Sequence, residues 1–300
     1  MAHNFESKRK NGIIITAAVC IVAVIIAYFT NYPGFGKNNI LPESFDTTQD
    51  FIKVLDVGQA ESILVYSNGY CALFDTGTSD SANEICSALS EFGIKTIDVM
   101  LVSHLHTDHI GGIKGILEKY PASNLVLPEL STESEGMGQA QFAINKVTDD
   151  GGESYNAKQG MNFEIGEFEI TVLAAYSDMD DENNRSIIAV AEIDNRKFMF
   201  TGDAETKVEN LLLNEGLNLK CDILSVGHHG SSTSSSTKFL QTVRPRYAVI
   251  SCGKNNMYGH PHNEVLAALE RNGAEVLRTD LQGDITFYFN EGKIKTKTEN

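Results

Sequence analysis

The sequence predicts an α/β protein in which two β-sheets pack face to face with helices outside, an αβ/βα sandwich. Short apolar segments rich in Val, Ile and Phe recur through residues 51–300. Segments with helical spacing follow them in each half of that range, so each half supplies strands and then helices. No proline-rich or charged linker interrupts residues 51–300, and we therefore expect them to form one domain.

The first half contains clear turn signals between its strands and helices. Asn68-Gly69 is a strong hairpin signal, Gly93 is expected to end the first helix, and Pro121 is expected to follow the second. The expected strands are 51–57, 62–66, 70–74, 97–102 and 125–127, and the expected helices are 82–92, 110–120 and 137–147.

The second half has the same order of elements. Asp194-Asn195-Arg196 is expected to connect two of its strands as a tight turn. The expected strands are 161–165, 168–173, 186–193, 197–201, 223–226, 247–251, 275–278 and 285–289, and the expected helices are 205–214, 237–242 and 264–272.

The amino terminus carries an uncharged apolar run, residues 13–30, of the length that a bilayer-spanning helix needs. Three basic residues at 8–10 precede it and only Lys37 follows closely, so the positive-inside rule places the amino terminus in the cytoplasm. We therefore expect a single-pass protein of the cell membrane. Its parts would be a cytoplasmic tail at 1–12, a transmembrane signal anchor at 13–30, a linker at 31–50 and an extracytoplasmic domain at 51–300.

Two other interpretations of the apolar run are open. It would be a cleaved signal peptide if a small-x-small site followed it, but residues 27–31, Ala-Tyr-Phe-Thr-Asn, offer no clean site. Cys20 would be a lipidation site, but Val19 precedes it where a small residue is needed, and the uncharged run continues to Thr30.

The charge of the chain argues against a dedicated nucleic-acid binder. The formal net charge is -16, and residues 1–37 hold four of the 24 basic and one of the 40 acidic residues, so the remainder carries -19. Such a surface repels polyanions and lacks a basic footprint. A phosphodiester substrate is still compatible with it, because bound metal ions reverse the local field.

The five cysteines form no C-x-x-C pair. Apart from Cys20, they have apolar neighbours, and we expect them to be small buried hydrophobic residues. Two disulfides are compatible with an extracytoplasmic domain, but the sequence does not require them.

Seven of the eight histidines fall in three clusters, and the densest is His104-x-His106-x-Asp108-His109 after an apolar strand. Three imidazoles and a carboxylate on one turn can supply metal ligands. Their alternating spacing suits two ions rather than one. Asp203 and the His228-His229 pair each follow a strand of the second half, where they can complete the two coordination spheres.

At this point the sequence resembles a known family. Asp75-Thr76-Gly77, His104-x-His106-x-Asp108-His109, Thr201-Gly202-Asp203 and Gly227-His228-His229 are similar in order and spacing to the metallo-β-lactamase superfamily. Within it, the runs 55–62, 227–231 and 258–262 resemble the hydrolase domain of the ComEC competence-protein family. The resemblance spans about residues 51–290 and implies the four-layer metallo-β-lactamase sandwich. ComEC proteins are polytopic, so the resemblance does not imply DNA uptake.

The resemblance also implies roles for single residues. His104 and His106 would bind the first metal, whereas Asp108, His109 and His229 would bind the second. Asp203 would bridge the two ions. Asp75 would orient the metal loop from outside the ligand shell. His229 is favoured over His228 as the last ligand, because that histidine usually precedes a small residue.

One departure from the superfamily pattern concerns the first site. Most members have another histidine before the bridging aspartate, whereas residues 110–202 contain none. The run Asn183-Asn184-Arg185-Ser186 lies where that ligand is expected, and Asn184 would offer an amide oxygen. An amide oxygen is a harder and weaker ligand, which favours manganese more than a histidine would. We therefore expect two divalent metal ions, zinc or manganese, with a weak first site.

The function these features predict is metal-dependent phosphodiester hydrolysis outside the cytoplasm by metal-activated water. Asp108 and His260 are the candidate catalytic residues. His260, and with less support His262, would contact the substrate or protonate the leaving oxygen. The other interpretation of these histidines is a solvent-exposed loop before a helix capped by Asn263.

The expected substrate is a small or polymeric phosphodiester, with DNA as one candidate, and no protein partner is predicted. Two other functions are compatible with the fold. One is hydrolysis of lactams, lactones or thioesters, and the other is a non-catalytic metal-binding surface module.

Overall fold

The computed structural model describes residues 49–300, which belong to one compact unit, Thr47–Asn300. The expected tail and transmembrane anchor, and nearly all of the expected linker, lie outside the described residues. Within residues 49–300, no helix combines the length and the apolar character needed to cross a membrane.

The first sheet has eight strands in the order β15-β14-β1-β2-β3-β4-β5-β6. The strands from β3 to β6 run parallel, and the other neighbours are antiparallel. Their bounds are β1 Asp50–Val54, β2 Ile63–Ser67, β3 Tyr70–Phe74, β4 Ile97–Leu101, β5 Ala122–Leu127, β6 Glu153–Asn156, β14 Ile285–Asn290 and β15 Lys293–Thr298.

The second sheet has seven strands in the order β13-β12-β11-β10-β9-β8-β7. The strands from β7 to β10 are antiparallel, and those from β10 to β13 are parallel. Their bounds are β7 Asn162–Ile165, β8 Phe168–Ala174, β9 Ile188–Ile193, β10 Arg196–Phe200, β11 Ile223–Ser225, β12 Tyr247–Ile250 and β13 Glu275–Arg278.

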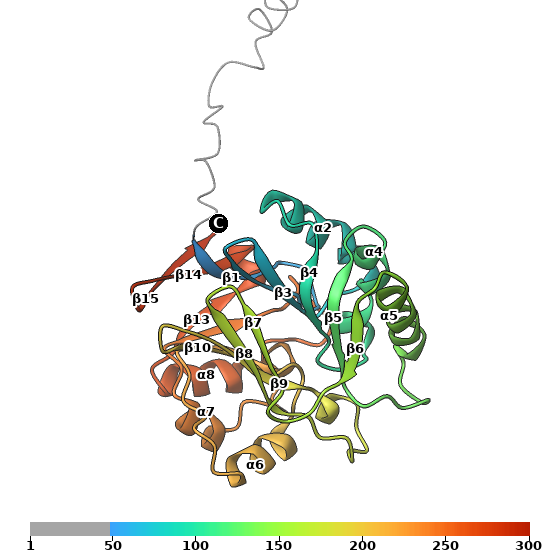
Figure 1. Ribbon diagram of the computed structural model, residues 1–300. Helices are drawn as coiled ribbons and strands as arrows, with labels where there is room; N and C mark the ends of the chain where they lie inside the picture. Colours follow the sequence, from blue (N-terminus) through green and yellow to red (C-terminus); the bar gives the residue numbers. More distant parts are fainter. Residues whose placement is uncertain (1–48) are drawn as a thin grey trace, which may run out of the picture. The chain divides into compact units, whose positions relative to one another are not determined.

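The helices lie outside the two sheets, in two groups (Figure 1). The first sheet carries α2 Ala82–Glu91, α4 Ile113–Leu117 and α5 Met137–Asp149, and the second carries α6 Thr206–Asn214, α7 Thr237–Val243 and α8 Asn263–Arg271. The short helix α3 Thr107–Ile110 lies in the segment between β4 and α4. Single turns are η1 Ser79–Ser81, η2 Asn183–Arg185, η3 Gly227–Gly230 and α9 Thr279–Gln282. The α/β sandwich of two sheets predicted from the sequence is therefore confirmed.

A continuous apolar core joins the two sheets. It includes side chains from both, and the rings of Phe74 in β3 and Phe200 in β10 stack with centroids 3.7 Å apart. A second core lies between the second sheet and helices α6 to α8. Because both sheets bury apolar faces here, the loops at their strand ends have fixed positions relative to each other.

The structure corrects the sequence interpretation in three places. The strand predicted at 285–289 does not stay with the second half, because β14 pairs with β1 and extends the first sheet. The strands β6 and β15 were not predicted, since their sequences are short on apolar residues. The helix predicted at 110–120 is two short helices, α3 and α4, separated at Gly111 and Gly112.

The cysteines behave as the sequence predicts. The four within residues 49–300 are buried and free.

Candidate metal centre

The candidate ligands follow strand ends of both sheets. His104 to His109 follow β4, Asp203 follows β10, and His229 follows β11. The carboxyl ends of parallel strands meet at one edge of a sheet. Facing sheets therefore bring these side chains together from segments far apart in the chain.

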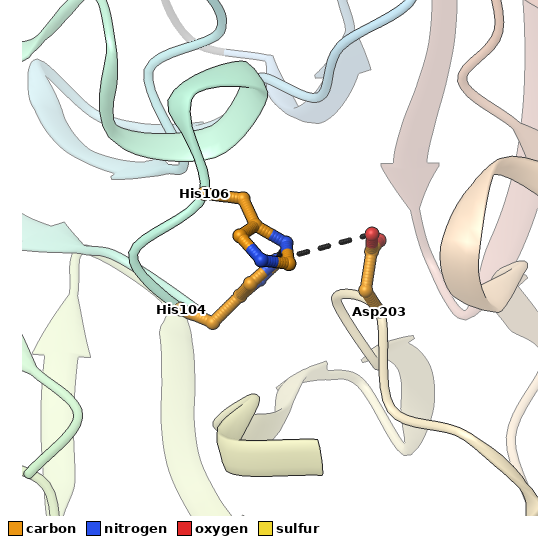
Figure 2. Close-up of side chains that lie close together, drawn as sticks. All are labelled: His104, His106 and Asp203. Carbon is orange, nitrogen blue, oxygen red and sulfur yellow. Dashed lines mark hydrogen bonds and ion pairs between the residues drawn. The ribbon is translucent and has the colours of Figure 1, made fainter. Parts of the chain in front are cut away.

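The first ligand group consists of His104, His106 and Asp203, shown in Figure 2. One candidate ligand atom from each lies within 4.8 Å of the others. His104 is fully buried, and its Nε2 lies 3.1 Å from Nδ1 of His106 and 3.9 Å from Oδ2 of Asp203.

The second ligand group consists of Asp108, His109 and His229, again with ligand atoms within 4.8 Å of one another. Nε2 of His229 lies 3.3 Å from Oδ2 of Asp108, and Nε2 of His109 lies 4.0 Å from the same oxygen. Three side chains from two sheets thus converge on one point.

Asp203 lies between the two groups. Its Oδ2 faces His104, whereas its Oδ1 lies 3.3 Å from Nε2 of His109 and 3.8 Å from Nε2 of His229. Asp203 is 2% exposed. Each of its oxygens therefore faces a different ligand group, which is the geometry of a bridging carboxylate.

Hydrogen bonds outside the ligand groups fix the histidine rings. Nδ1 of His109 donates to Oδ2 of Asp75 at 2.7 Å, and Nδ1 of His229 donates to the Ser251 carbonyl at 2.9 Å. The Ser103 hydroxyl donates to Asp75 and accepts from Nδ1 of His104 at 3.1 Å. Each bond occupies Nδ1, so Nε2 of each ring faces the centre, where it offers a lone pair when the ring is neutral.

Asp75 holds this arrangement from a strained position. Its φ is 56°, in the left-handed region that few non-glycine residues adopt. This conformation lets both of its oxygens accept hydrogen bonds. Oδ1 accepts from the Ser103 amide at 2.7 Å, and Oδ2 accepts from the Ser103 hydroxyl and the His109 ring. The carboxylate that the resemblance assigned to orienting the metal loop does contact that loop.

The charges of the centre depend on one another. Burial acts to lower the pKa of His109, but the carboxylates of Asp203 and Asp75 outweigh it and hold that pKa well above its usual value. Burial acts in the same way on His229, and Asp203 and Asp108 again raise the pKa. His104 differs, because burial and then the charge of His109 hold its pKa well below the usual value.

The two carboxylates remain ionised. Burial acts to raise the pKa of both Asp203 and Asp108, but the neighbouring His109 and His229 outweigh it and hold both values below the usual range. The centre therefore combines the buried carboxylate of Asp203 and the half-buried carboxylate of Asp108 with imidazoles, the donor set that zinc or manganese accepts.

Unsatisfied buried atoms test whether this set fits a metal. Within residues 49–300, Nε2 of His109, Nε2 of His229 and Oδ1 of Asp203 are buried without a hydrogen-bond partner. Such atoms are rare in folded proteins and call for an explanation such as an ion. All three point at the second ligand group, so the residues fit a bound cation.

Comparison with known proteins identifies the family. Residues 55–254 match the Metallo-beta-lactamase superfamily. The chain belongs to this superfamily.

The metallo-β-lactamase relatives include competence proteins. "ComE operon protein 3" of Bacillus subtilis is 27% identical over 95% of this chain and 37% of its own length. "Competence protein ComA" of Neisseria gonorrhoeae is 33% identical over 85% of this chain and 35% of its own length. The chain thus spans about a third of these relatives, and the ComEC-like resemblance is supported for that part.

Solved structures show the same fold. The metallo-beta-lactamase fold protein YhfI from Bacillus subtilis covers 80% of this chain and 100% of its own, with a TM-score of 0.55 and 13% identity. Igni18, a metallo hydrolase from Ignicoccus hospitalis, covers the same shares with a TM-score of 0.53 and 16% identity. At these identities the similarity concerns the fold alone. The prediction of the metallo-β-lactamase fold is confirmed.

A cavity of about 550 Å³ opens over the metallo-β-lactamase centre. Its volume is that of a small-molecule site. Both ligand groups contribute to its wall, together with side chains that had not been assigned a role. The lining residues are Gln59, Thr78, His106, Thr107, Asp108, Glu135, Asn183, Asp203, His228, His229, Tyr258 and His260.

His260 lies on this cavity in a rigid loop. The Asn256 side chain accepts from the backbone amides of Tyr258 and His260 and donates to the carbonyls of Gly253 and His260. Burial, and then the charges of His228, His229 and His262, lower the pKa of His260 to about 4. Near neutral pH the ring is therefore uncharged.

Gln59 sets which nitrogen of His260 carries the proton. Its Oε1 accepts from the Gly253 amide at 3.0 Å, so its Nε2 is the donor that lies 3.5 Å from Nδ1 of His260. Nε2 of His260 then carries the hydrogen. Gln59 and Tyr258 belong to the ComEC-like runs 55–62 and 258–262, so the sequence contained them without indicating their contacts.

Three further candidates have other surroundings. Nε2 of His228 lies 3.6 Å from Oδ2 of Asp203, on the cavity wall. Nδ1 of His262 accepts from the Ser232 amide at 2.9 Å, and within residues 49–300 His262 is not part of the cavity wall. His262 is itself the N-cap of α8, so the expectation that Asn263 caps this helix is wrong.

Asn184 is buried, and its amide contacts Glu205 at both ends. Oδ1 accepts from the Glu205 amide at 3.2 Å, and Nδ2 donates to the Glu205 carboxylate at 3.2 Å. The side chain predicted as an amide ligand thus holds the turn that carries Asp203.

Proposed function

We propose that this chain is a two-metal phosphodiester hydrolase of the metallo-β-lactamase superfamily that acts outside the cytoplasm. The observation that carries the proposal is Asp203, whose two oxygens face two separate ligand groups. Two divalent ions bound there would polarise the scissile group and lower the pKa of a water. Hydrolysis of a phosphodiester uses such a pair to offset negative charge on both the attacking and the leaving oxygen.

The residues of the chain support this chemistry in distinct ways. Asp203 and Asp108 hold negative charge at the centre without being protonated, because their pKa values are low. His260 would donate a hydrogen bond from Nε2 to a substrate oxygen, as a neutral ring held by Gln59. With a pKa of about 4, His260 is a poor source of a full proton near neutral pH.

The rim of the cavity supports a substrate with flat rings. Tyr258 lines the cavity with 62% of its surface exposed, and the adjacent Met257 is 90% exposed. The Asn256 hydrogen bonds hold the backbone of this loop, and the Tyr258 ring lies beside His260 with centroids 5.7 Å apart, where a base could stack on it. Relatives named for competence and, in Haemophilus influenzae, "Recombination protein 2" also favour DNA as the first substrate to test.

The acidic surface favours a short or single-stranded substrate over long duplex DNA. With a charge of -19 beyond residue 37, the chain repels a polyanion over most of its area. A single strand that reaches the centre end-on places fewer phosphates against that surface. The location outside the cytoplasm rests on the apolar run at 13–30 and its basic flank.

A thioester hydrolase is the second candidate function. "Hydroxyacylglutathione hydrolase" of Aliivibrio salmonicida is 31% identical over 83 residues, or 26% of this chain. The match is short, but it makes a thioester the most useful competing substrate.

The test is a substrate panel on the purified 300-residue chain loaded with manganese or zinc. We expect cleavage of single-stranded DNA and of bis(p-nitrophenyl) phosphate, and little turnover of a hydroxyacylglutathione thioester or a β-lactam. Asp203→Ala should abolish cleavage, whereas Asp149→Ala, which removes an exposed carboxylate on α5, should not. Thioester turnover without phosphodiester turnover would establish the second candidate instead.

The rim has its own test within the same panel. Tyr258→Ala should raise KM for single-stranded DNA by about 10-fold, since stacking on an aromatic ring contributes about 1–3 kcal/mol per base. The kcat for bis(p-nitrophenyl) phosphate should change little, because that substrate does not need the loop for its phosphorus to reach the metals. An unchanged KM for DNA would remove Tyr258 from substrate binding.

A further inference from the structure

We propose that the side-chain oxygen of Asn183 completes the first metal site, together with His104, His106 and Asp203. It would take the position that a histidine holds in most members of the superfamily. The inference rests on the two-metal centre of the proposed function, but it concerns metal binding and not the reaction catalysed.

The first observation is an unsatisfied atom. Five side-chain atoms in residues 49–300 are buried and have no hydrogen-bond partner. Three of them belong to His109, Asp203 and His229, and a fourth is Oδ1 of Asn183. Asn183 also lines the cavity over the centre. An amide oxygen shielded from solvent in this position lacks a donor or a cation, and such atoms in native structures need one.

The second observation places Asn183 beside the first ligand group. The Leu105 amide, between His104 and His106, donates to the Glu182 carboxylate at 3.2 Å. The Ile187 amide donates to the Ser103 carbonyl at 2.9 Å. The segment around η2 is therefore fastened at both ends to the loop that carries the two histidines.

The same segment is fastened to the turn that carries Asp203. The Asp203 amide donates to the Ser186 hydroxyl at 3.0 Å, and the Glu205 amide donates to Asn184 at 3.2 Å. Asn183 thus belongs to a segment held between the histidine loop and the Asp203 turn, and it lines the same cavity as His106 and Asp203.

These contacts also decide between the two adjacent asparagines. Asn184 uses both ends of its side-chain amide on Glu205, whereas the side-chain oxygen Oδ1 of Asn183 has no hydrogen-bond partner within residues 49–300. Asn184 therefore has a structural role, whereas Asn183 has a side-chain oxygen available to a metal ion. The sequence placed residues 183–186 at this site and named Asn184 as the amide ligand, whereas the contacts favour Asn183.

His228 is the competing candidate for the first site. Its Nε2 lies 3.6 Å from Oδ2 of Asp203. However, its Nδ1 contacts Thr233, and the side chain is 22% exposed at the cavity wall. It does not belong to the compact group of ligand atoms that His104, His106 and Asp203 form within the described residues. We therefore assign His228 to the substrate side of the cavity.

An amide oxygen changes which metal the first site prefers. Oxygen ligands suit manganese, whereas an additional imidazole suits zinc. The first site should then bind zinc less tightly than the second and should discriminate less against manganese.

The test measures metal binding without substrate, on the full chain stripped of metal. Free Mn²⁺ is followed by electron paramagnetic resonance during titration, and zinc by competition with an indicator. The variants are Asn183→Ala, Asn183→Asp, Asn183→His and His228→Ala. The matched control is Asn145→Ala, which removes an exposed amide on α5.

We expect the wild-type chain and Asn145→Ala to bind two Mn²⁺ ions with two affinities. Asn183→Ala should weaken only the weaker class, by at least about 10-fold, the lower end of what loss of an outer ligand partner costs. Asn183→Asp should restore that class, and Asn183→His should shift it toward zinc by a similar factor. Asn183→Asp keeps the size of the side chain, so it reports on the site even if Asn183→Ala folds poorly.

Three outcomes would overturn the proposal. They are unchanged binding by Asn183→Ala, a wild-type chain that binds a single ion, and loss of the weaker class in His228→Ala but not in Asn183→Ala. None of them depends on turnover. A chain that binds two ions through Asn183 but cleaves no phosphodiester would contradict the proposed function and leave this inference intact.

Discussion

The two ligand groups share Asp203 but differ in what surrounds them. In the second group, a carboxylate orients His109 and a backbone carbonyl orients His229. In the first group, a hydroxyl orients His104, and Nδ1 of His106 contacts the His104 ring itself. An ionised carboxylate, such as the partner of His109, fixes a ring more firmly than a hydroxyl does. We infer that the second site is built for tight binding and the first for a more exchangeable ion.

Removal of Asp203 should empty both metal sites, so the difference in affinity between them should disappear. Asp203→Ala takes one ligand from each group, and several kcal/mol of metal-derived stabilisation would be lost, which corresponds to a fall in kcat/KM of about 1000-fold or more. Metal content should fall from two ions per chain toward none, measured by mass spectrometry after desalting. A variant that keeps one ion would show that Asp203 does not bridge.

Removal of His229 should break the second site alone. His229→Ala should leave one weakly held ion and lower kcat by about 100-fold, as expected when one of two charges on the reacting group is lost. His104→Ala is the matched variant and should leave one tightly held ion. If both variants lose both ions, the two sites form one cooperative unit and the comparison between them does not hold.

Asp75 and Ser103, which orient the ligand histidines, should each affect mainly one of the two metal sites. Asp75→Asn removes the charge that orients His109 and should weaken the second site by about 10- to 100-fold, the usual cost of losing such a partner. Ser103→Ala removes the hydroxyl that orients His104 and should weaken mainly the first site. Manganese titrations of the two variants measure this, and equal effects on both sites would show that Asp75 and Ser103 act as one network.

The sequence predicted which side chains the fold would bring together, because the candidate ligands lie in short motifs at strand ends. His104, His106, Asp108 and His109 come from one turn, and their order alone suggested two ions. Asp203 and His229 were placed by the strands that precede them. The positions of these side chains depend on β4, β10 and β11, and the apolar sequences of these strands predict them clearly.

The contacts that distinguish the two sites could not be predicted in this way. The roles of Asn183 and Asn184 depend on the position of the single turn η2. Hydrogen bonds of Glu182, Ser186 and Glu205 hold that turn against residues 77, 17 and 21 positions away in the chain. Neither residue has a motif that specifies such bonds. For the same reason, the last hairpin was not assigned to the first sheet, since its pairing with β1 joins the two ends of the domain.

The smallest expected difference between the two sites is in how strongly protons compete with metal for their histidines. The pKa values of His109 and His229 are raised, so each ring of the second site keeps its proton to a higher pH and must release it when a metal binds. The pKa of His104 is lowered, so its ring is already neutral. Metal affinity of the second site should therefore rise with pH by up to about 10-fold per unit for each proton released, and the first site should change less.

Titrations with manganese at pH 6, 7 and 8 would measure this difference. The affinities of the two sites should converge as the pH falls, because the proton competes at the second site first. Asp75→Asn is the control, since without that carboxylate the pKa of His109 should fall and the pH dependence of the second site should become shallower. If the metal affinities of both sites changed equally with pH, the two ligand groups would titrate as one unit. The histidines of the second site would then not explain its tighter binding.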